Sequence, residues 1–385
     1  AAPGLDANAY ESLGLSNALG LNSGARDNRA ALFDDALKPR ALTDVDQWVE
    51  LEALADVVGR IIDTANGDED GSSLTVGDFD NLGLTNVTAD NLNAVVETVK
   101  GSGAANADSI SDLDGLVGAS GSTDLSTGIG LYQDSVDKIK GYAEGTSNTK
   151  PTPEDYRLAG VDLAEQGVSL TDTQFKDAIA TVLAATDVTG NDVADTAGIK
   201  GVVETYATIL NAADQSSTLS LPDSDYADLG LTDVGAEEAS LLNGVLSGKL
   251  VSEVDTWTKL DDLADIASRV MDTTAGSASP ALTKSELNND LGITGSPVTS
   301  DNLDAVLGAI GRQTSVGGVD TLAELDNVVS AAVQGHVDAL GRIGDYADAP
   351  VGSAPDVSDY VSVGVAPALA GDTGLLDSGN TVLAS

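Results

Sequence analysis

The sequence predicts an all-α protein made of tandem three-helix modules, each of about 70 residues, joined by short Gly/Ser/Pro linkers. The first supporting observation is a recurring stretch, because TKSELNNDLGITGSPVTSDNLDAVLGAI at 283–310 matches TVGDFDNLGLTNVTADNLNAVVETV at 75–99. The second is the spacing of Leu92, Val95, Val96 and Val99, which places one apolar stripe along a helix. The third is that no sustained period-two alternation of β-branched residues, typical of strands, is found.

The first element of each module is a short helix centred on an aromatic residue or a leucine. Thr152 is the expected N-cap of one of them, with Pro153 at the first helical position and acids in the first turn. Glycines follow several of these helices where a left-handed residue would end them: Gly83, Gly160, Gly230 and Gly292. The predicted helix centres are Tyr10, Phe79, Tyr156, Tyr226, Leu287 and Tyr360.

The second element is an amphipathic helix and the third is a longer one. The long helices Val45–Thr64 and Val254–Thr273 share the pattern VD-x-W followed by a matching apolar series, 209 positions apart, which indicates a higher-order duplication. A further helix is expected near Leu131–Tyr142. The predicted second helices are Asp27–Leu37, Thr88–Val99, Thr171–Ala184, Ala236–Leu246, Thr299–Ile310 and Asp372–Leu383, and the other long ones are Asp108–Val117, Asp195–Ala212 and Asp320–Leu340.

These elements divide the chain into five complete modules and a sixth partial one. The predicted modules are residues 1–66, 67–147, 148–216, 217–277, 278–350 and 351–385, with linkers at 67–73, 145–151, 216–222, 276–280 and 348–355. The sixth module lacks a long helix to cover its apolar residues. Either the natural chain is truncated there, or another copy covers this end in a head-to-tail contact.

Composition restricts the classes of partner. With 62 acidic and 18 basic residues the formal net charge is -44, which disfavours nucleic acid and anionic membrane surfaces as partners and suits saline surroundings. The absence of Cys excludes disulfides and thiolate metal sites. No apolar run is long enough for a transmembrane helix. The chain starts Ala1-Ala2-Pro3 without Met, so we expect a chain processed after secretion or cut from a longer one.

One stretch resembles a calcium loop. In NGDEDGSSLTVGD the candidate ligands are Asn66, Asp68, Asp70 and Asp78, with Gly71 at the turn. The hydrophobic and final acidic positions fall one residue later than an EF-hand requires. An acidic, solvated linker explains the same pattern, so calcium is a possible cofactor and both interpretations stay open.

Other candidate residues indicate structure rather than chemistry. His336 is the single histidine, so it cannot form a typical zinc site with Cys partners and is expected on a helix surface or partly buried. Trp48 and Trp257 are predicted to be core anchors, with a carbohydrate platform as the alternative. No nucleophile elbow, phosphate-binding loop or dinucleotide motif is present, so we predict a protein without enzymatic activity.

Three stretches suggest a family. PTPEDYRLAGV at 151–161, VTADNLNAVVETV at 87–99 and VDTLAELDNVV at 319–329 resemble the helical repeats of very large secreted surface proteins of Gram-negative bacteria, of the adhesin and biofilm type. The resemblance implies an extracellular or cell-surface, non-enzymatic scaffold whose partners are copies of itself or neighbouring repeats. The modules here diverge more than tandem adhesin repeats do, which leaves room for a dedicated subunit of a filament or surface layer. The alternative function is a calcium-dependent, ligand-binding adhesion module.

Overall fold

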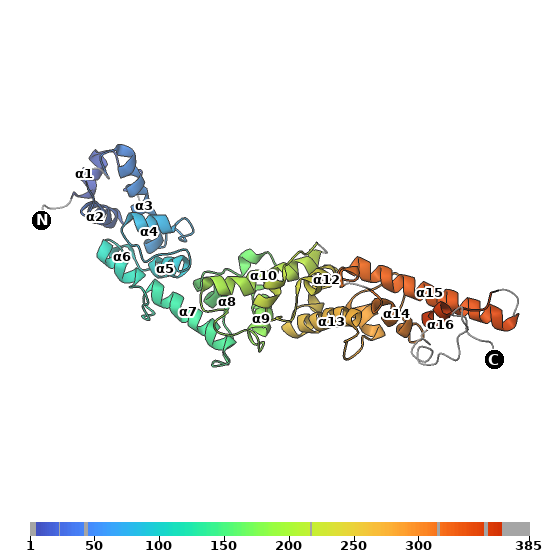
Figure 1. Ribbon diagram of the computed structural model, residues 1–385. Helices are drawn as coiled ribbons and strands as arrows, with labels where there is room; N and C mark the ends of the chain where they lie inside the picture. The colour runs from blue at the N-terminus through green and yellow to red at the C-terminus, as the bar shows by residue number, and fades with distance from the viewer. Residues whose placement is uncertain are drawn as a thin grey trace. The chain divides into compact units, whose positions relative to one another are not determined.

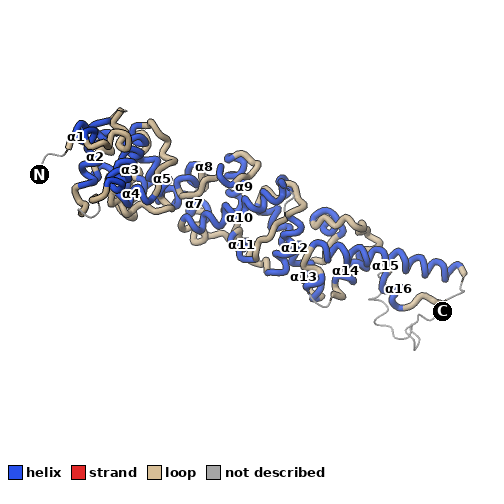
Figure 2. Tube along the Cα trace, turned by 90° about the horizontal axis from the view of Figure 1, so that it is seen from above, coloured by secondary structure: helices blue, strands red, loops and turns tan. Residues whose placement is uncertain are grey.

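The computed structural model describes residues 5–22, 24–41, 45–215, 218–313, 316–349 and 353–363, and within them the chain is all-α. Helices and loops make up the described part, without a strand, as Figure 2 shows. No helix in these ranges is both long enough and apolar enough to cross a membrane. The predicted fold class is therefore confirmed at the level of secondary structure, whereas the division into tandem three-helix modules stays a prediction.

The chain forms two compact units. The N-terminal unit comprises Ala1–Gln166, Asp172–Ala180 and Thr189–Val203, and the C-terminal unit comprises Gly167–Thr171, Thr181–Val188 and Glu204–Ser385. Figure 1 labels every α-helix except α11, which Figure 2 labels. The α-helices are α1 (Ala7–Ser12), α2 (Arg26–Leu37), α3 (Trp48–Asn66), α4 (Val76–Asn81), α5 (Leu92–Val99), α6 (Ile110–Val117), α7 (Gly128–Ala143), α8 (Pro153–Leu158), α9 (Asp172–Leu183), α10 (Thr196–Gln215), α11 (Asp223–Asp228), α12 (Ala236–Leu246), α13 (Trp257–Ala275), α14 (Leu303–Ile310), α15 (Leu322–Asp348) and α16 (Val357–Ser362). A π-helical turn at Glu286–Asp290 and short 3-10 turns complete the set.

The N-terminal unit has one continuous hydrophobic core from α1 to α7. Tyr10 and Phe33 meet edge to face with their ring centroids 5.0 Å apart, a favourable aromatic geometry. The same core includes Ala65 and Leu74, on either side of the predicted module boundary after residue 66. The Gly/Ser-rich stretch at 67–73 is thus a surface loop beside a shared core, not a gap between two cores.

The C-terminal unit is built mainly from aliphatic residues of its long and medium helices. Tyr206 and Tyr226 are fully buried among them, and each phenol has a partner: Tyr206 donates to the carbonyl of Val254 at 3.0 Å, and Tyr226 donates to the side chain of Asn243 at 3.0 Å. A buried hydroxyl without a hydrogen-bond partner would destabilise the folded state. Because both phenols have a partner, their large rings can be buried in the core without this cost.

The short helices lie where the sequence predicts them. Tyr10, Phe79, Tyr156, Tyr226 and Leu287 are each at most 1% exposed, so each centre is a core residue. The predicted stop glycines have positive φ angles, between 73° at Gly292 and 87° at Gly160. Leu287 precedes its glycine by one residue more than Phe79 does, and the wider π-helical turn at Glu286–Asp290 accommodates that extra residue.

Two of the medium helices begin later than predicted. The sequence pattern starts them at Thr88 and Thr299, but α5 begins at Leu92 and α14 at Leu303. In each case an asparagine one position before the helix folds the chain into a turn instead. The Asn91 side chain accepts from the Thr88 amide at 2.9 Å and donates to the Asn86 carbonyl at 3.0 Å, and Asn302 accepts from the Thr299 amide at 2.8 Å.

The remaining predicted helices match with small shifts at their ends. The paired long helices α3 and α13 both run for 19 residues and end at a left-handed glycine, Gly67 and Gly276. Helix α15 runs to Asp348, beyond the predicted Leu340. The expected helix Asp372–Leu383 lies outside the described residues.

Candidate functional site

Four short helical elements are fastened to the long helix before them by the same arrangement, which we call the helix joint. In each, an acid at the third position of the short helix accepts a hydrogen bond from the backbone amide of its N-cap residue, at 2.7–3.0 Å. Such a cap satisfies an amide that the helix leaves free. The N-cap and acid pairs are Thr75 and Asp78, Thr152 and Asp155, Thr283 and Glu286, and Asp356 and Asp359.

The other carboxylate oxygen, or in one case both, meets a basic side chain of the preceding long helix. Lys138 of α7 approaches Asp155 at 3.0 Å, and Arg269 of α13 forms a two-pronged pair with Glu286 at 2.6 and 3.1 Å. Arg60 of α3 pairs with Asp78, and Arg342 of α15 pairs with Asp359. The base precedes the acid by 17 or 18 positions in all four joints.

The acids of the joints are buried and their charges are compensated. Asp78, Asp155 and Asp359 are 5%, 7% and 4% exposed, so an unpaired carboxylate there would be costly. Burial raises the pKa of Asp155, but hydrogen bonds from Thr152 and the ammonium of Lys138 outweigh it and leave the pKa below its usual range. The Arg269 guanidinium likewise holds the pKa of Glu286 low. The carboxylates of Asp155 and Glu286 are therefore charged at neutral pH.

Sequence reasoning recognised the caps but missed the joints. The signal was available, since Lys and Arg are only 18 of the 385 residues and four of them stand 17 or 18 positions before a capping acid. In a chain with so few cations, that recurrence is informative. The joints lie in both compact units, two in each.

Arg269 also lines an open groove of about 470 Å3 that contains two further cations. Lys249 is 8% exposed and donates to the carbonyl of Asn289 at 2.9 Å. Lys259 pairs with Asp255 at 2.5 Å and donates to the carbonyl of Ser252 at 2.7 Å. The basic groups of this groove thus bind the chain's own oxygens and extend the joint between α13 and Glu286–Asp290.

The four residues of the predicted calcium loop have different partners. Asn66 donates to Asp68 at 2.8 Å, and Asp70 accepts from the amide of Ser72 at 2.9 Å. The Ser72 side chain, and after it this amide, lower the pKa of Asp70. Asp78 belongs to the joint with Arg60 and Thr75. No cluster of three or more His, Cys, Asp or Glu side chains with metal-binding geometry occurs within the described ranges. Calcium binding by this loop stays a prediction, and it would need Asp78 to leave the joint.

The prediction for the two tryptophans is wrong for Trp48. Trp257 is partly buried, and its indole donates to the carbonyl of Leu229 at 2.8 Å. Trp48 is 45% exposed and therefore is not a core anchor. His336 is more buried than expected, at 6% exposed, with Nδ1 3.1 Å from the carbonyl of Ser362, so it connects α15 to α16.

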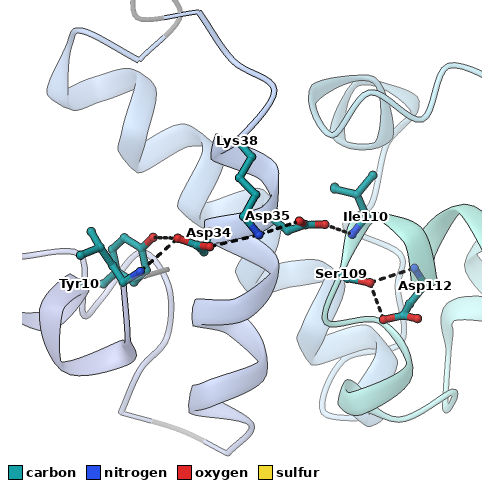
Figure 3. Close-up of polar contacts among 8 residues, drawn as sticks. Tyr10, Asp34, Asp35, Lys38, Ser109, Ile110 and Asp112 are labelled. Carbon is teal, nitrogen blue, oxygen red and sulfur yellow. Dashed lines mark hydrogen bonds and ion pairs between the residues drawn. The ribbon is translucent and has the colours of Figure 1, made fainter. Parts of the chain in front are cut away.

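An acidic groove of about 500 Å3 lies over α2 in the N-terminal unit. Figure 3 shows the polar contacts of its acids. Asp34 accepts a hydrogen bond from the Tyr10 hydroxyl at 3.3 Å, and Asp35 accepts one from the amide of Ile110 at 2.9 Å. Lys38 forms ion pairs with both acids. Burial raises the pKa of Tyr10, and the charge of Asp34 adds to that shift. The Ile110 amide lowers the pKa of Asp35. These acids fasten α1 and α6 to α2, as the joints fasten the short helices.

Comparison with known proteins found no matching family model, no matching curated protein and no matching solved structure. The recurring feature of this chain is the ion pair that fixes a short helix to the long helix before it.

Proposed function

We propose that this chain is a non-enzymatic structural protein of the bacterial cell exterior, a repeat scaffold of a surface adhesin, extracellular filament or matrix, and that it associates with copies of itself. The observation that carries the proposal is the helix joint, repeated four times with the same spacing. A joint that recurs along a chain favours a role in which each module holds the next, as in stacked repeat proteins.

Charge and resemblance support the same function. A net charge of -44 keeps a scaffold soluble and suits saline surroundings, where salt screens the repulsion between its acids. The tandem modules of about 70 residues inferred from the sequence would be the repeating parts of this scaffold. Their resemblance to adhesin repeats is the reason for proposing an extracellular or cell-surface location.

The proposal is tested on the full chain by negative-stain electron microscopy and by antibody labelling of intact source cells. We expect filaments or ordered aggregates, and labelling without permeabilising the cells. Labelling that requires permeabilised cells would overturn the proposed location, and isolated monomers at high concentration in salt would overturn self-association.

A second candidate function is a calcium-dependent, ligand-binding adhesion module. One observation favours it: Asp63, at the base of the predicted loop, has a raised pKa, first because it is buried and then because Glu69 and Asp68 are close, while Arg29 opposes the shift. The negative charges of neighbouring carboxylates repel one another, and a divalent cation would relieve that repulsion.

A further inference from the structure

The duplication seen in the sequence provides two copies of one surface, of which one is contacted by another segment of the chain and the other is exposed. Helices α3 and α13 begin with Trp48 and Trp257, run for 19 residues each and carry matching sequences. In both copies the tryptophan lies beside the end of a short helix that is followed by glycine. Trp257 binds the carbonyl of Leu229, and the Trp48 ring is 3.6 Å from the position that a Cβ would occupy on Gly14.

In the second copy an upstream segment, Thr181–Val188, contacts this surface at Trp257 and Gly230, whereas Thr258 is exposed. The backbone amide of Trp257 donates to the Thr181 hydroxyl at 2.8 Å. A Cβ on Gly230 would lie 2.9 Å from the Val188 side chain and 3.3 Å from its amide nitrogen, so the two backbones are in close contact. Leu229 is consequently fully buried. All of these residues belong to the C-terminal unit.

In the first copy the equivalent surface is open. We call it the Trp48 face, comprising Leu13, Gly14, Trp48 and Val49. Leu13, the counterpart of the buried Leu229, is 54% exposed, and Val49 is 64% exposed. Val49 stands where the second copy has Thr258, so the open surface is also the more apolar one. Exposed apolar side chains thus flank the one contact that is shown here, between the Trp48 ring and Gly14.

The sequence contains a second version of the segment that contacts the Trp257 surface. Thr381–Ala384 reads TVLA, identical to Thr181–Ala184. Each copy follows a related short helix, PTPEDYRLAGV at 151–161 and APDVSDYVSVGV at 354–365. Within the chain, the first version precedes the surface that it contacts. For the second version, Thr381–Ala384, the Trp48 face of another molecule is a surface of the same kind.

We propose that the Trp48 face binds the segment Thr381–Ala384 of a second copy of this chain, as the Trp257 surface binds Thr181–Val188. This inference rests on the proposed self-associating scaffold and specifies its contact. Two different surfaces meet in such a contact, so it is heterologous and extends into a filament unless it closes into a ring.

The absence of cysteine in the natural sequence permits a direct test. A full-length V49C chain is mixed with a full-length T381C chain under mild oxidation. We expect a covalent heterodimer, because Thr181 contacts the position next to the equivalent of Val49. The matched control replaces V49C with L125C, which is 55% exposed in a loop, and should give no heterodimer. Equal cross-linking by V49C and L125C would overturn the inference.

A second measurement uses association without cross-linking. Leu13→Asp and Trp48→Ala should each weaken self-association by about tenfold or more in sedimentation velocity, since apolar anchors dominate such interfaces. Leu250→Asp is the control, because Leu250 is 67% exposed and lies elsewhere. All three positions are exposed, so circular dichroism and the melting temperature should stay unchanged.

The outcomes separate this inference from the proposed function. If the parent chain associates and both variants associate equally well, the Trp48 face is not the contact, although the self-associating scaffold stands. If a chain carrying V49C and T381C together closes on itself as a covalent monomer, the occupant is the chain's own segment and not a second copy. If the parent is monomeric at all concentrations, the docking inference fails, and cell-surface labelling still tests the location of the scaffold.

Discussion

Trp48 and Trp257 occupy equivalent positions in two related helices, yet their side chains have different surroundings. A tryptophan contributes to stability according to the contacts it makes in the fold, not according to its type alone. The indole of Trp257 has a hydrogen-bond partner and its backbone amide binds Thr181. The indole of Trp48 is close to half exposed.

The two tryptophans should therefore differ in mutational cost. Trp257→Ala is expected to lower the free energy of unfolding by about 2–4 kcal/mol, because it removes a partly buried ring and leaves a cavity. Trp48→Ala should cost less than about 1 kcal/mol. Denaturant titration of both variants measures the difference, and equal costs would contradict the environments described above.

The joint acids give a prediction with a defined pH dependence. Glu286→Gln should cost about 1–2 kcal/mol at neutral pH, because the variant loses a two-pronged pair with Arg269. The pKa of Glu286 is lowered in the folded state, so its contribution is present above the unfolded pKa and is lost as pH falls through the folded value. The variant and the parent should thus converge in stability in acid, once the pH has fallen below the folded pKa of Glu286.

The control for this experiment is Glu165→Gln, an exposed acid outside the joints. It should change the melting temperature little at any pH. A loss in Glu286→Gln that persists undiminished in acid would show that shape, and not the ion pair, accounts for the effect.

At the scale of single elements, two of the stop glycines separate the cost of backbone strain from the cost of a steric collision, which usually occur together when a glycine is replaced. Gly83 and Gly160 have φ angles of 82° and 87°, so an alanine at either position is strained. A Cβ at Gly83 would meet open space, whereas one at Gly160 would lie 2.8 Å from the carbonyl oxygen of Asp90. The first position reports backbone strain alone, and the second reports strain and a collision with the neighbouring loop.

Gly83→Ala is accordingly expected to cost about 1–2 kcal/mol, and Gly160→Ala at least about 1 kcal/mol more. Thermal and denaturant unfolding of the two variants measure this difference. If the two substitutions cost the same, the α8 glycine does not pack closely against the loop at Asp90.

The existence and type of most elements followed from the sequence, because the apolar spacing, the Thr caps and the stop glycines act locally. The late starts of α5 and α14 did not, because an asparagine side chain competes with the helix for the same backbone amides. The exposure of Trp48 could not be predicted either. Trp257, its equivalent, contacts Thr181, which lies 76 positions earlier in the sequence. The similar local sequences around the two tryptophans give no information about whether such a distant segment covers them.

Only one of the two parts of each helix joint, the cap of the short helix, could be predicted from the sequence. The threonine caps and the acids in the first turn after Thr152 are local signals and were recognised, whereas the basic partner of each acid lies 17 or 18 positions earlier, across a loop. That spacing depends on how the short helix folds back onto the long one, which is tertiary structure.

The predicted calcium loop is tested at the same scale. If Asn66–Asp78 binds calcium, calcium should raise the melting temperature more than magnesium at equal ionic strength. Asp68→Ala combined with Asp70→Ala should abolish that difference, because it removes two of the candidate ligands. Asp80→Ala is a suitable control acid outside the candidate set. Identical responses of parent and double variant would leave screening as the full explanation.

For the molecule as a whole, the excess of acid is the dominant electrostatic term. The 18 basic residues cannot neutralise 62 acidic ones, and part of them are held in the joints. The remaining acids repel one another. This repulsion opposes the compact state, and it acts over distances that salt can screen.

Added salt has two opposite effects here, and their balance gives the last prediction. Screening weakens the joints, but their charged groups lie at short range and the carboxylates of Asp78, Asp155 and Asp359 are buried, which makes screening less effective there. It weakens the repulsion among exposed acids more strongly, since the screening length falls from about 10 Å at 0.1 M to about 3 Å at 1 M. The melting temperature should therefore rise between low salt and about 1 M sodium chloride at neutral pH. Near pH 4, close to the sequence pI of about 4.1, the net charge approaches zero and the rise should largely disappear. A melting temperature that falls with salt at neutral pH would mean that the ion pairs, and not the excess of acid, dominate the stability of this protein.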